Sequence, residues 1–146
     1  MAEQHSNPRG AFVHPIAVLA EHIDALGHVG NVTWVRFIND AAIAHSDSIG
    51  LDFGAYRALG LMWVVRRHEI DYIGAALVGD RLEASTWIGS LRGATSVRHT
   101  RFERGGELLV RAQTTWVLLS AAGRPTRVPA ELAARYGFAP GGARSA

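Results

Sequence analysis

The 146-residue chain contains no cysteine and no lysine. The absence of cysteine excludes disulfide scaffolds, thiol nucleophiles and thiolate metal sites, while it leaves the cellular compartment open. The absence of lysine makes all 15 basic residues arginine, and it excludes Schiff-base chemistry because that chemistry requires a lysine amine. A Gly-x-Ser-x-Gly elbow and a Gly-x-x-x-x-Gly-Lys loop are also missing, which argues against a serine hydrolase and a nucleotide-driven enzyme.

The chain also lacks a long apolar run and a strong excess of charge. No apolar stretch reaches the length of a membrane-spanning helix, so we expect no membrane insertion. The isoelectric point is about 9.7, but the formal net charge is only +2. Because the arginines are scattered, we expect no nucleic-acid partner. Residues 1–10 are polar and have no hydrophobic signal core, which predicts a cytoplasmic protein.

The length and the 48% hydrophobic content indicate one domain with a core of its own. Apolar residues at helical spacing predict a helix over 31–49, with Asn31 as its N-cap and Gly50 as its C-cap. Shorter periods predict strands over 11–19, 62–73, 81–90, 95–103 and 108–120.

The segments between and after these elements complete the expected fold. Residues 51–61 are expected to form a loop or short helix, residues 130–136 a last short helix, and residues 141–146 a disordered tail. Neighbouring strands are expected to pair in an antiparallel meander. The order of elements predicts an α+β fold in which a helix packs on an antiparallel sheet.

The segment Asp24-Ala25-Leu26-Gly27-His28-Val29-Gly30-Asn31 carries the strongest indication of chemistry. It places a carboxylate and an imidazole four residues apart, directly before the long helix. Two glycines allow a tight turn. The helix start supplies free N–H groups and positive potential, so it can hold a polarised carbonyl oxygen while Asp24 directs attack on the carbon.

This segment resembles the Asp-x-x-x-His-Val-Asn-Asn loop of the hotdog-fold acyl thioesterases, the group that contains 4-hydroxybenzoyl-CoA thioesterase and the acyl-carrier-protein thioesterases. Later turns agree with it in order, namely Asp71-Tyr72 with Gly79-Asp80 and Gly123-Arg124-Pro125 with Val128-Pro129. The resemblance implies a single hotdog domain over 1–146, with a core of about 13–136 and flexible ends. It further implies an acyl-CoA thioesterase that needs no cofactor or metal. The protein is expected to be a homodimer or homotetramer with its active sites at the subunit interfaces.

By this resemblance Asp24 is the catalytic carboxylate, acting as nucleophile or as general base on water. Its alternative role is that of a turn residue that binds nearby backbone N–H groups. His28 is either catalytic or a polar link between loop and sheet. Asn31 is expected to orient the loop or a water besides capping the helix. The backbone of His28, Val29 and Gly30 is expected to bind the thioester oxygen, although Gly30 has the alternative role of only making the turn.

The chain departs from the acyl-carrier-protein thioesterases at three positions. Leu26 stands where those enzymes have Asn, Gly30 replaces the first Asn of their pair, and Ala75 falls where their downstream Glu aligns. These departures favour a simpler mechanism that is centred on Asp24.

Further residues are candidates for substrate binding. Arg92, Arg98 and Arg127 lie by predicted strand ends or turns, and guanidinium groups suit the phosphates of CoA. Trp34 is expected to line the acyl site, although tryptophans, including Trp63, Trp87 and Trp116, usually belong to the core.

Three alternatives remain at this stage. Asp40 on the helix is a minor candidate for the catalytic carboxylate. His22, Asp24 and His28 superficially resemble a metal site, but a loop with two glycines gives no reason for convergent geometry. An acyl-thioester hydratase or dehydratase, or a non-catalytic acyl-CoA-binding protein, would use the same fold.

Overall fold

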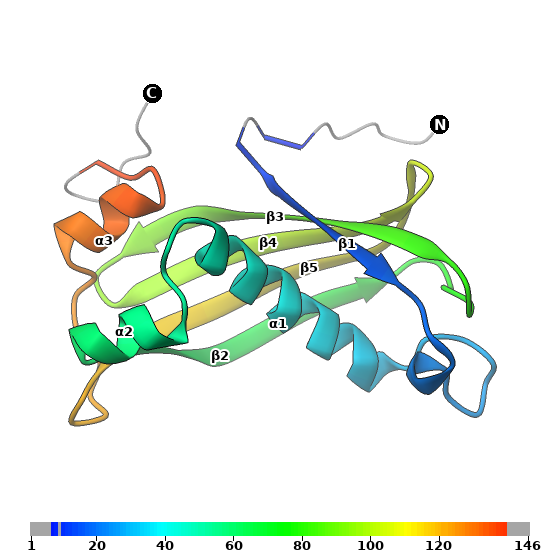
Figure 1. The fold of residues 1–146 in the computed structure, drawn as a ribbon, viewed down its shortest axis with the longest axis horizontal. Helices are drawn as coiled ribbons and strands as arrows, with labels where there is room; N and C mark the ends of the chain where they lie inside the picture. Colours follow the sequence, from blue (N-terminus) through cyan, green and yellow to red (C-terminus); the bar gives the residue numbers. More distant parts are fainter. Residues whose placement is uncertain (1–6, 9, 140–146) are drawn as a thin grey trace.

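The computed structural model describes residues 7, 8 and 10–139. The flexible N-terminal and C-terminal ends expected from the sequence fall largely outside these residues. Five antiparallel strands form one sheet in the order β1-β3-β4-β5-β2 (Figure 1). The strands are β1 (Phe12–Ala17), β2 (Leu61–Tyr72), β3 (Arg81–Arg92), β4 (Thr95–Arg104) and β5 (Glu107–Ser120).

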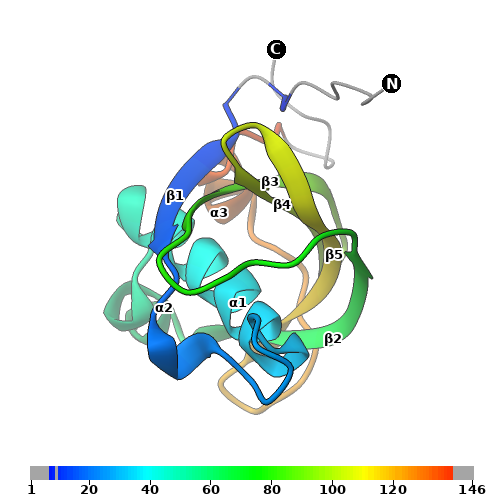
Figure 2. The ribbon, with the colours of Figure 1, turned by 90° about the vertical axis from the view of Figure 1, so that its right-hand side faces the viewer.

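The long helix α1 (Asn31–Ser48) is enclosed by this sheet, which curves around it (Figure 2). A short 3-10 helix, η1 (Ala20–His22), precedes the loop that leads into α1. Two short helices, α2 (Phe53–Leu59) and α3 (Ala130–Arg135), lie at the opposite end of the molecule from that loop (Figure 1). The α+β hotdog fold expected from the sequence is therefore confirmed.

The expected meander is correct for β3, β4 and β5 and wrong for β2. Strand β2 pairs with β5 at one edge of the sheet, because β3 takes β1 and β4 as its neighbours. Residues 73–80 carry the chain across the end of the sheet from β2 to β3 (Figure 2). Hydrogen bonds from the backbone N–H groups of Ile73 and Gly74 to Leu109 O hold the start of this crossing.

Both expected caps of α1 are displaced by one residue. Gly30, with an extended backbone, is the N-cap, and Asn31 is the first helical residue. Ile49 is the C-cap, and Gly50 follows it in the left-handed conformation at φ 78°, which glycine adopts without steric cost. The helix itself is confirmed, and only its ends differ.

The core forms where α1 faces the sheet. The buried residues of the helix recur at helical spacing and are Trp34, Phe37, Ile38, Ala41 and Ala42. They pack against side chains of the inner sheet face that include Ala84, Phe102 and Val110. None of the helices in the described part of the chain is both long and apolar enough to span a membrane.

Candidate active site

The loop before α1 holds Asp24 in a closed turn. Its backbone N–H donates to His28 O at 3.0 Å, and the N–H of Gly27 donates to Asp24 O at 3.0 Å. Gly27 has a φ of 84°, which favours glycine at this position. The carboxylate Oδ1 accepts the N–H of Leu26 at 2.8 Å. Asp24 therefore does make the expected turn contact, and its exposed second oxygen stays available for chemistry.

The carboxylate of Asp24 lies against Gly30 at the start of α1. A Cβ added at Gly30 would fall 3.2 Å from Asp24 Oδ2 and 3.3 Å from Asp24 Cβ. Contacts this short leave little room for a side chain. Glycine at position 30 therefore lets the carboxylate and the helix start approach each other closely.

The backbone donors next to Asp24 differ from those expected. The N–H of Val29 donates to Ala76 O at 2.9 Å, and the N–H of Gly30 points to His22 O at 3.3 Å. The first hydrogen bond within the helix runs from the N–H of Trp34 to Gly30 O. The N–H groups of residues 31–33 precede it and have no partner within the helix. The N–H groups of Val29 and Gly30 thus already have backbone partners, whereas those of the first turn of α1 have none within the helix. Which of these groups bind a substrate oxygen stays a prediction.

His28 and Asn31 lie beside this site without a direct hydrogen bond to the Asp24 side chain among those described. His28 is half-buried, and its Nδ1 is 3.3 Å from Val29 O. Asn31 is exposed on the first turn of α1. The structure therefore brings Asp24 close to Gly30, with His28 on the loop and Asn31 on the first turn of the helix.

Val29 and Trp34 belong to the core. Their side chains are 2% and 3% exposed. Trp34 packs edge-on against Phe37 and Phe102, with ring centroids 5.7 and 5.1 Å apart. The helical repeat directs this ring into the sheet, and Trp34 is not among the residues that line the cavity described below. Its expected contact with the acyl group stays a prediction.

The three candidate arginines divide into two groups. Arg92 is exposed at the end of β3, and Arg127 is exposed in the segment before α3, so both remain candidates for binding phosphate. Arg98 is in the middle of β4 and only 4% exposed. The expected position at a strand end is therefore wrong, and the burial of Arg98 removes the reason for expecting it to bind CoA phosphate at the surface.

The remaining sequence candidates show ordinary structural contacts. His22 Nδ1 accepts the N–H of Leu19 at 2.9 Å, and the ring packs edge-on against Phe37. Asp40 is half-exposed and lies 3.9 Å from Arg36 Nε. Among residues 7, 8 and 10–139, no three histidine or carboxylate side chains gather as metal ligands, so His22, Asp24 and His28 do not form such a group.

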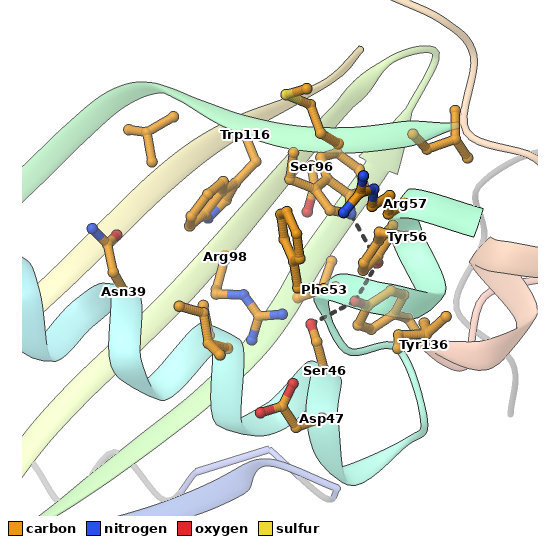
Figure 3. Close-up of a pocket in the computed structure, with 18 of the residues that line it drawn as sticks. Asn39, Ser46, Asp47, Phe53, Tyr56, Arg57, Ser96, Arg98, Trp116 and Tyr136 are labelled. Atoms are coloured by element: carbon orange, nitrogen blue, oxygen red, sulfur yellow. Dashed lines mark hydrogen bonds between the residues drawn. The ribbon is translucent and has the colours of Figure 1, made fainter. Parts of the chain in front are cut away.

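A cavity of about 610 Å³ is a feature that the sequence analysis missed. It lies between the C-terminal half of α1, α2, β2 and the inner sheet face, and its walls are largely apolar (Figure 3). Its size is within the usual range for pockets that enclose a small ligand. Two buried polar atoms on residues of its wall, Asn39 Oδ1 and Trp116 Nε1, have no described hydrogen-bond partner. The cavity is therefore suited to a mainly apolar ligand with a few polar groups.

Hydroxyl groups form a continuous hydrogen-bonded chain on one side of the cavity (Figure 3). Trp63 Nε1 donates to Tyr56 OH at 2.9 Å, the two phenols of Tyr56 and Tyr136 are 2.6 Å apart, and Tyr136 OH is 2.7 Å from Ser46 Oγ. Burial, followed by the neighbouring Tyr136, raises the pKa of Tyr56 far above its ordinary value. The phenol of Tyr56 therefore stays neutral at physiological pH.

Arg98 lies on the wall of the same cavity and reaches from β4 toward α1. Its Nη1 donates to His45 Nδ1 at 2.9 Å and to Thr86 Oγ1 at 3.0 Å. Burial lowers the pKa of Arg98 to about 10, so the guanidinium remains a cation at neutral pH. The alternation of β4 places Ser96, Arg98 and Thr100 on one face. That pattern was available in the sequence, but it did not show that this face is the inner one.

Comparisons with known proteins agree with this geometry. Residues 11–136 match the family model of the acyl-ACP thioesterase N-terminal domain. Among curated proteins, no sequence matches the chain.

Solved structures with the same fold come from several bacteria. A hypothetical protein from Thermus thermophilus is 22% identical with a TM-score of 0.80, over 85% of this chain and 95% of that one. A probable thioesterase from Bartonella henselae is 24% identical with a TM-score of 0.77, over 82% and 99% of the two chains. A 1,4-dihydroxy-2-naphthoyl-CoA thioesterase from Synechocystis is 21% identical with a TM-score of 0.75, over 82% and 90%.

The curved sheet around α1 and the similarity to these structures define a hotdog fold. Because the family model matches most of its length, the chain belongs to the family of the acyl-ACP thioesterase N-terminal domain. It is a thioester hydrolase.

Proposed function

We propose that this protein hydrolyses acyl-CoA thioesters and that Asp24 is its catalytic carboxylate. The observation that carries the proposal is the contact between the Asp24 carboxylate and Gly30 at the N-terminus of an 18-residue helix. From the sequence of the same loop, we also propose that the protein belongs to the thioesterases that resemble 4-hydroxybenzoyl-CoA thioesterase. The acyl-CoA substrates named for the structural neighbours support CoA as the thiol.

The reaction consumes one water and releases a carboxylic acid and CoA thiol. The thioester oxygen binds the first-turn N–H groups of α1, where the helix dipole stabilises the negative charge that develops on it. Asp24 then either attacks the carbonyl carbon, forming an anhydride that water opens, or removes a proton from an attacking water. In both routes the C–S bond breaks and the thiolate leaves.

The acyl group, we propose, extends into the cavity of a second copy of the chain. Within one chain, Asn31 and the cavity residues of α1 from Asn39 to Asp47 are about 12 to 24 Å apart along the helix axis, at 1.5 Å per residue. Strand β2 forms an edge of the sheet and runs opposite to α1 (Figure 1). Antiparallel pairing of two β2 edges about a two-fold axis would set two α1 helices side by side in opposite directions. The start of one helix would then lie by the cavity of its partner.

Exposed apolar side chains support pairing along this edge. Val32, Ile43, Phe53 and Met62 are between 52% and 81% exposed. They lie on α1, α2 and β2, next to the unpaired edge. Because an exposed edge strand with apolar neighbours is usually covered, we propose a homodimer or a homotetramer built from such dimers.

Thiol release tests the proposed reaction directly. The wild type and Asp24→Asn are assayed with acyl-CoAs of short, medium, long and aromatic acyl groups, with Asp40→Asn as a matched control on the exposed face of α1. We expect Asp24→Asn to lose at least ~10²-fold in kcat while Asp40→Asn keeps its activity. A hydratase, a dehydratase or a non-catalytic acyl-CoA-binding protein would release no thiol from any substrate, and that result would overturn the proposal.

A further inference from the structure

Arg98 is a buried cation on the wall of a largely apolar cavity. Its side chain extends from β4 across the interior to His45 on α1. The two hydrogen bonds described for the guanidinium both start at Nη1, one to His45 and one to Thr86. Its Nη2 and Nε groups thus keep donor capacity for a ligand in the cavity (Figure 3).

No carboxylate neutralises this cation within the described part of the chain. The ion pairs there involve Arg36, Arg67, Arg101, Arg104 and Arg111, and none includes Arg98. The partners of Arg98 are an imidazole nitrogen and a hydroxyl. Asp47 also lines the cavity but is exposed. Burying an arginine without a counter-charge costs free energy. The described part of the chain supplies no negative group that would offset this cost for Arg98.

We propose that the cavity binds an acyl chain with a carboxylate at its far end, and that Arg98 binds this carboxylate. This proposal rests on the proposed function, because it names the acyl substrates of that reaction as monothioesters of dicarboxylic acids. A carboxylate matches the planar guanidinium, accepts two parallel N–H bonds and supplies the missing negative charge. The apolar wall then contacts the methylene groups between the two carbonyl carbons.

The surroundings of Arg98 suit an anion. The phenols of Tyr56 and Tyr136 line the same cavity as Arg98 and belong to the hydroxyl chain. Tyr136 also packs edge-on against His45, with ring centroids 5.7 Å apart. Because a guanidinium only donates, His45 Nδ1 is the acceptor in its hydrogen bond with Arg98. The groups around the guanidinium thus hold its position without cancelling its charge.

A different role for Arg98 would be purely structural, as a link between α1, β3 and β4 through His45 and Thr86. In that case the arginine would affect stability but not the choice between acyl chains. A matched pair of substrates separates the two roles. Adipyl-CoA and hexanoyl-CoA have six acyl carbons each and differ only in the terminal carboxylate or methyl group.

The first measurement is kcat/KM for both substrates with the wild type, Arg98→Met, Arg98→Lys and Arg101→Met. Arg101 is the matched control, since it lies on the same strand but on the opposite face. We expect the wild type to prefer adipyl-CoA by at least about tenfold, as for a hydrogen bond between charged groups. Arg98→Met should reverse the preference, Arg98→Lys should keep part of it, and Arg101→Met should leave the ratio unchanged. A wild type that prefers hexanoyl-CoA, or an unchanged ratio in a folded Arg98→Met, overturns the proposal.

The second measurement needs no turnover and no folded Arg98→Met. Calorimetry gives the Kd of Asp24→Asn for adipyl-CoA and for hexanoyl-CoA. Binding of adipyl-CoA that is at least about tenfold tighter than binding of hexanoyl-CoA supports the role of Arg98. This holds even if the wild type hydrolyses neither thioester. In that case only the proposed function fails. Equal binding combined with hydrolysis of both substrates retains the proposed function and overturns the carboxylate site.

Discussion

Asp24 and Gly30 lie close together across the turn that leads into α1: a methyl group on Gly30 would fall 3.2 Å from Asp24 Oδ2, so the carboxylate would have to shift by a few tenths of an ångström. The φ of Gly30 is −71°, which any residue adopts. The narrow space beside the carboxylate, and not the backbone conformation, therefore favours glycine at this position.

This contact predicts the effect of Gly30→Ala. The added methyl group should displace the Asp24 carboxylate from the helix start and lower kcat by at least about tenfold, because small misplacements of catalytic groups cost this much or more. Steady-state kinetics with the best acyl-CoA, together with thermal unfolding, measure the effect. Gly54→Ala is the control, since its Cβ would meet Asp52 Oδ1 at an ordinary 3.5 Å. Wild-type kcat in Gly30→Ala would show that the position of Asp24 is not critical.

The site shared between two copies predicts that activity depends on assembly. Light scattering should give at least twice the 15.7 kDa mass of one chain, and specific activity should fall on dilution as the dimer dissociates. Met62→Glu places a charge on the exposed edge of β2 and should weaken the dimer and the activity together. A monomer with full activity at micromolar concentration would contradict the shared site.

The hydroxyl chain predicts a loss of stability in Tyr136→Phe. This change removes the hydrogen bonds that Tyr136 OH makes with Tyr56 and Ser46, and we expect the free energy of unfolding to fall by about 1 to 2 kcal/mol. Urea unfolding provides the measurement. Tyr72→Phe, at an exposed tyrosine, should change stability by less than ~0.5 kcal/mol. Equal effects of the two substitutions would show that the hydrogen-bonded hydroxyl groups do not stabilise the fold.

The pKa of Asp80 predicts part of the acid sensitivity. The N–H of Leu77 and then Arg104 bind its Oδ2 at 2.8 and 2.7 Å, and both lower the pKa of the carboxyl below its ordinary 3.8. The ionised form is thus favoured by folding, so its contribution is present above about pH 4 and is lost as pH falls through the folded-state pKa. Asp80→Asn should lower Tm by about 3 °C at pH 7, and this difference should shrink toward pH 3. A difference that is the same at both pH values would rule out ionisation as its cause.

The two exposed arginines predict a defect confined to CoA substrates. Arg92→Ala and Arg127→Ala should raise KM for an acyl-CoA with little change in kcat, because phosphate contacts act equally in the ground and transition states. The same variants should behave as the wild type toward a truncated acyl-pantetheine thioester. If both variants bind acyl-CoA as the wild type does, these arginines are surface charge only.

Local patterns in the sequence determined where most elements lie. Helical spacing from Trp34 to Ala42 identified α1, and alternating segments around Gly79-Asp80 and Gly105-Gly106 identified the strands to within one or two residues, because periodicity and turn chemistry act between near neighbours in the chain. The loop of Asp24 was recognisable for the same reason. Its residues are contiguous, so their order alone indicated the site.

Only the tertiary structure decided the contacts between distant segments. The partner of β2 depends on which edge of the sheet remains available, and a strand pattern by itself is compatible with either neighbour. The burial of Arg98 depends on which face of β4 meets α1, and alternation cannot distinguish the inner face from the outer one. The cavity needs α1, α2, β2 and Tyr136 to converge from across the chain. Residues far apart in sequence make a site only when packing brings them together, and for this reason the sequence indicated the loop of Asp24 but not the pocket.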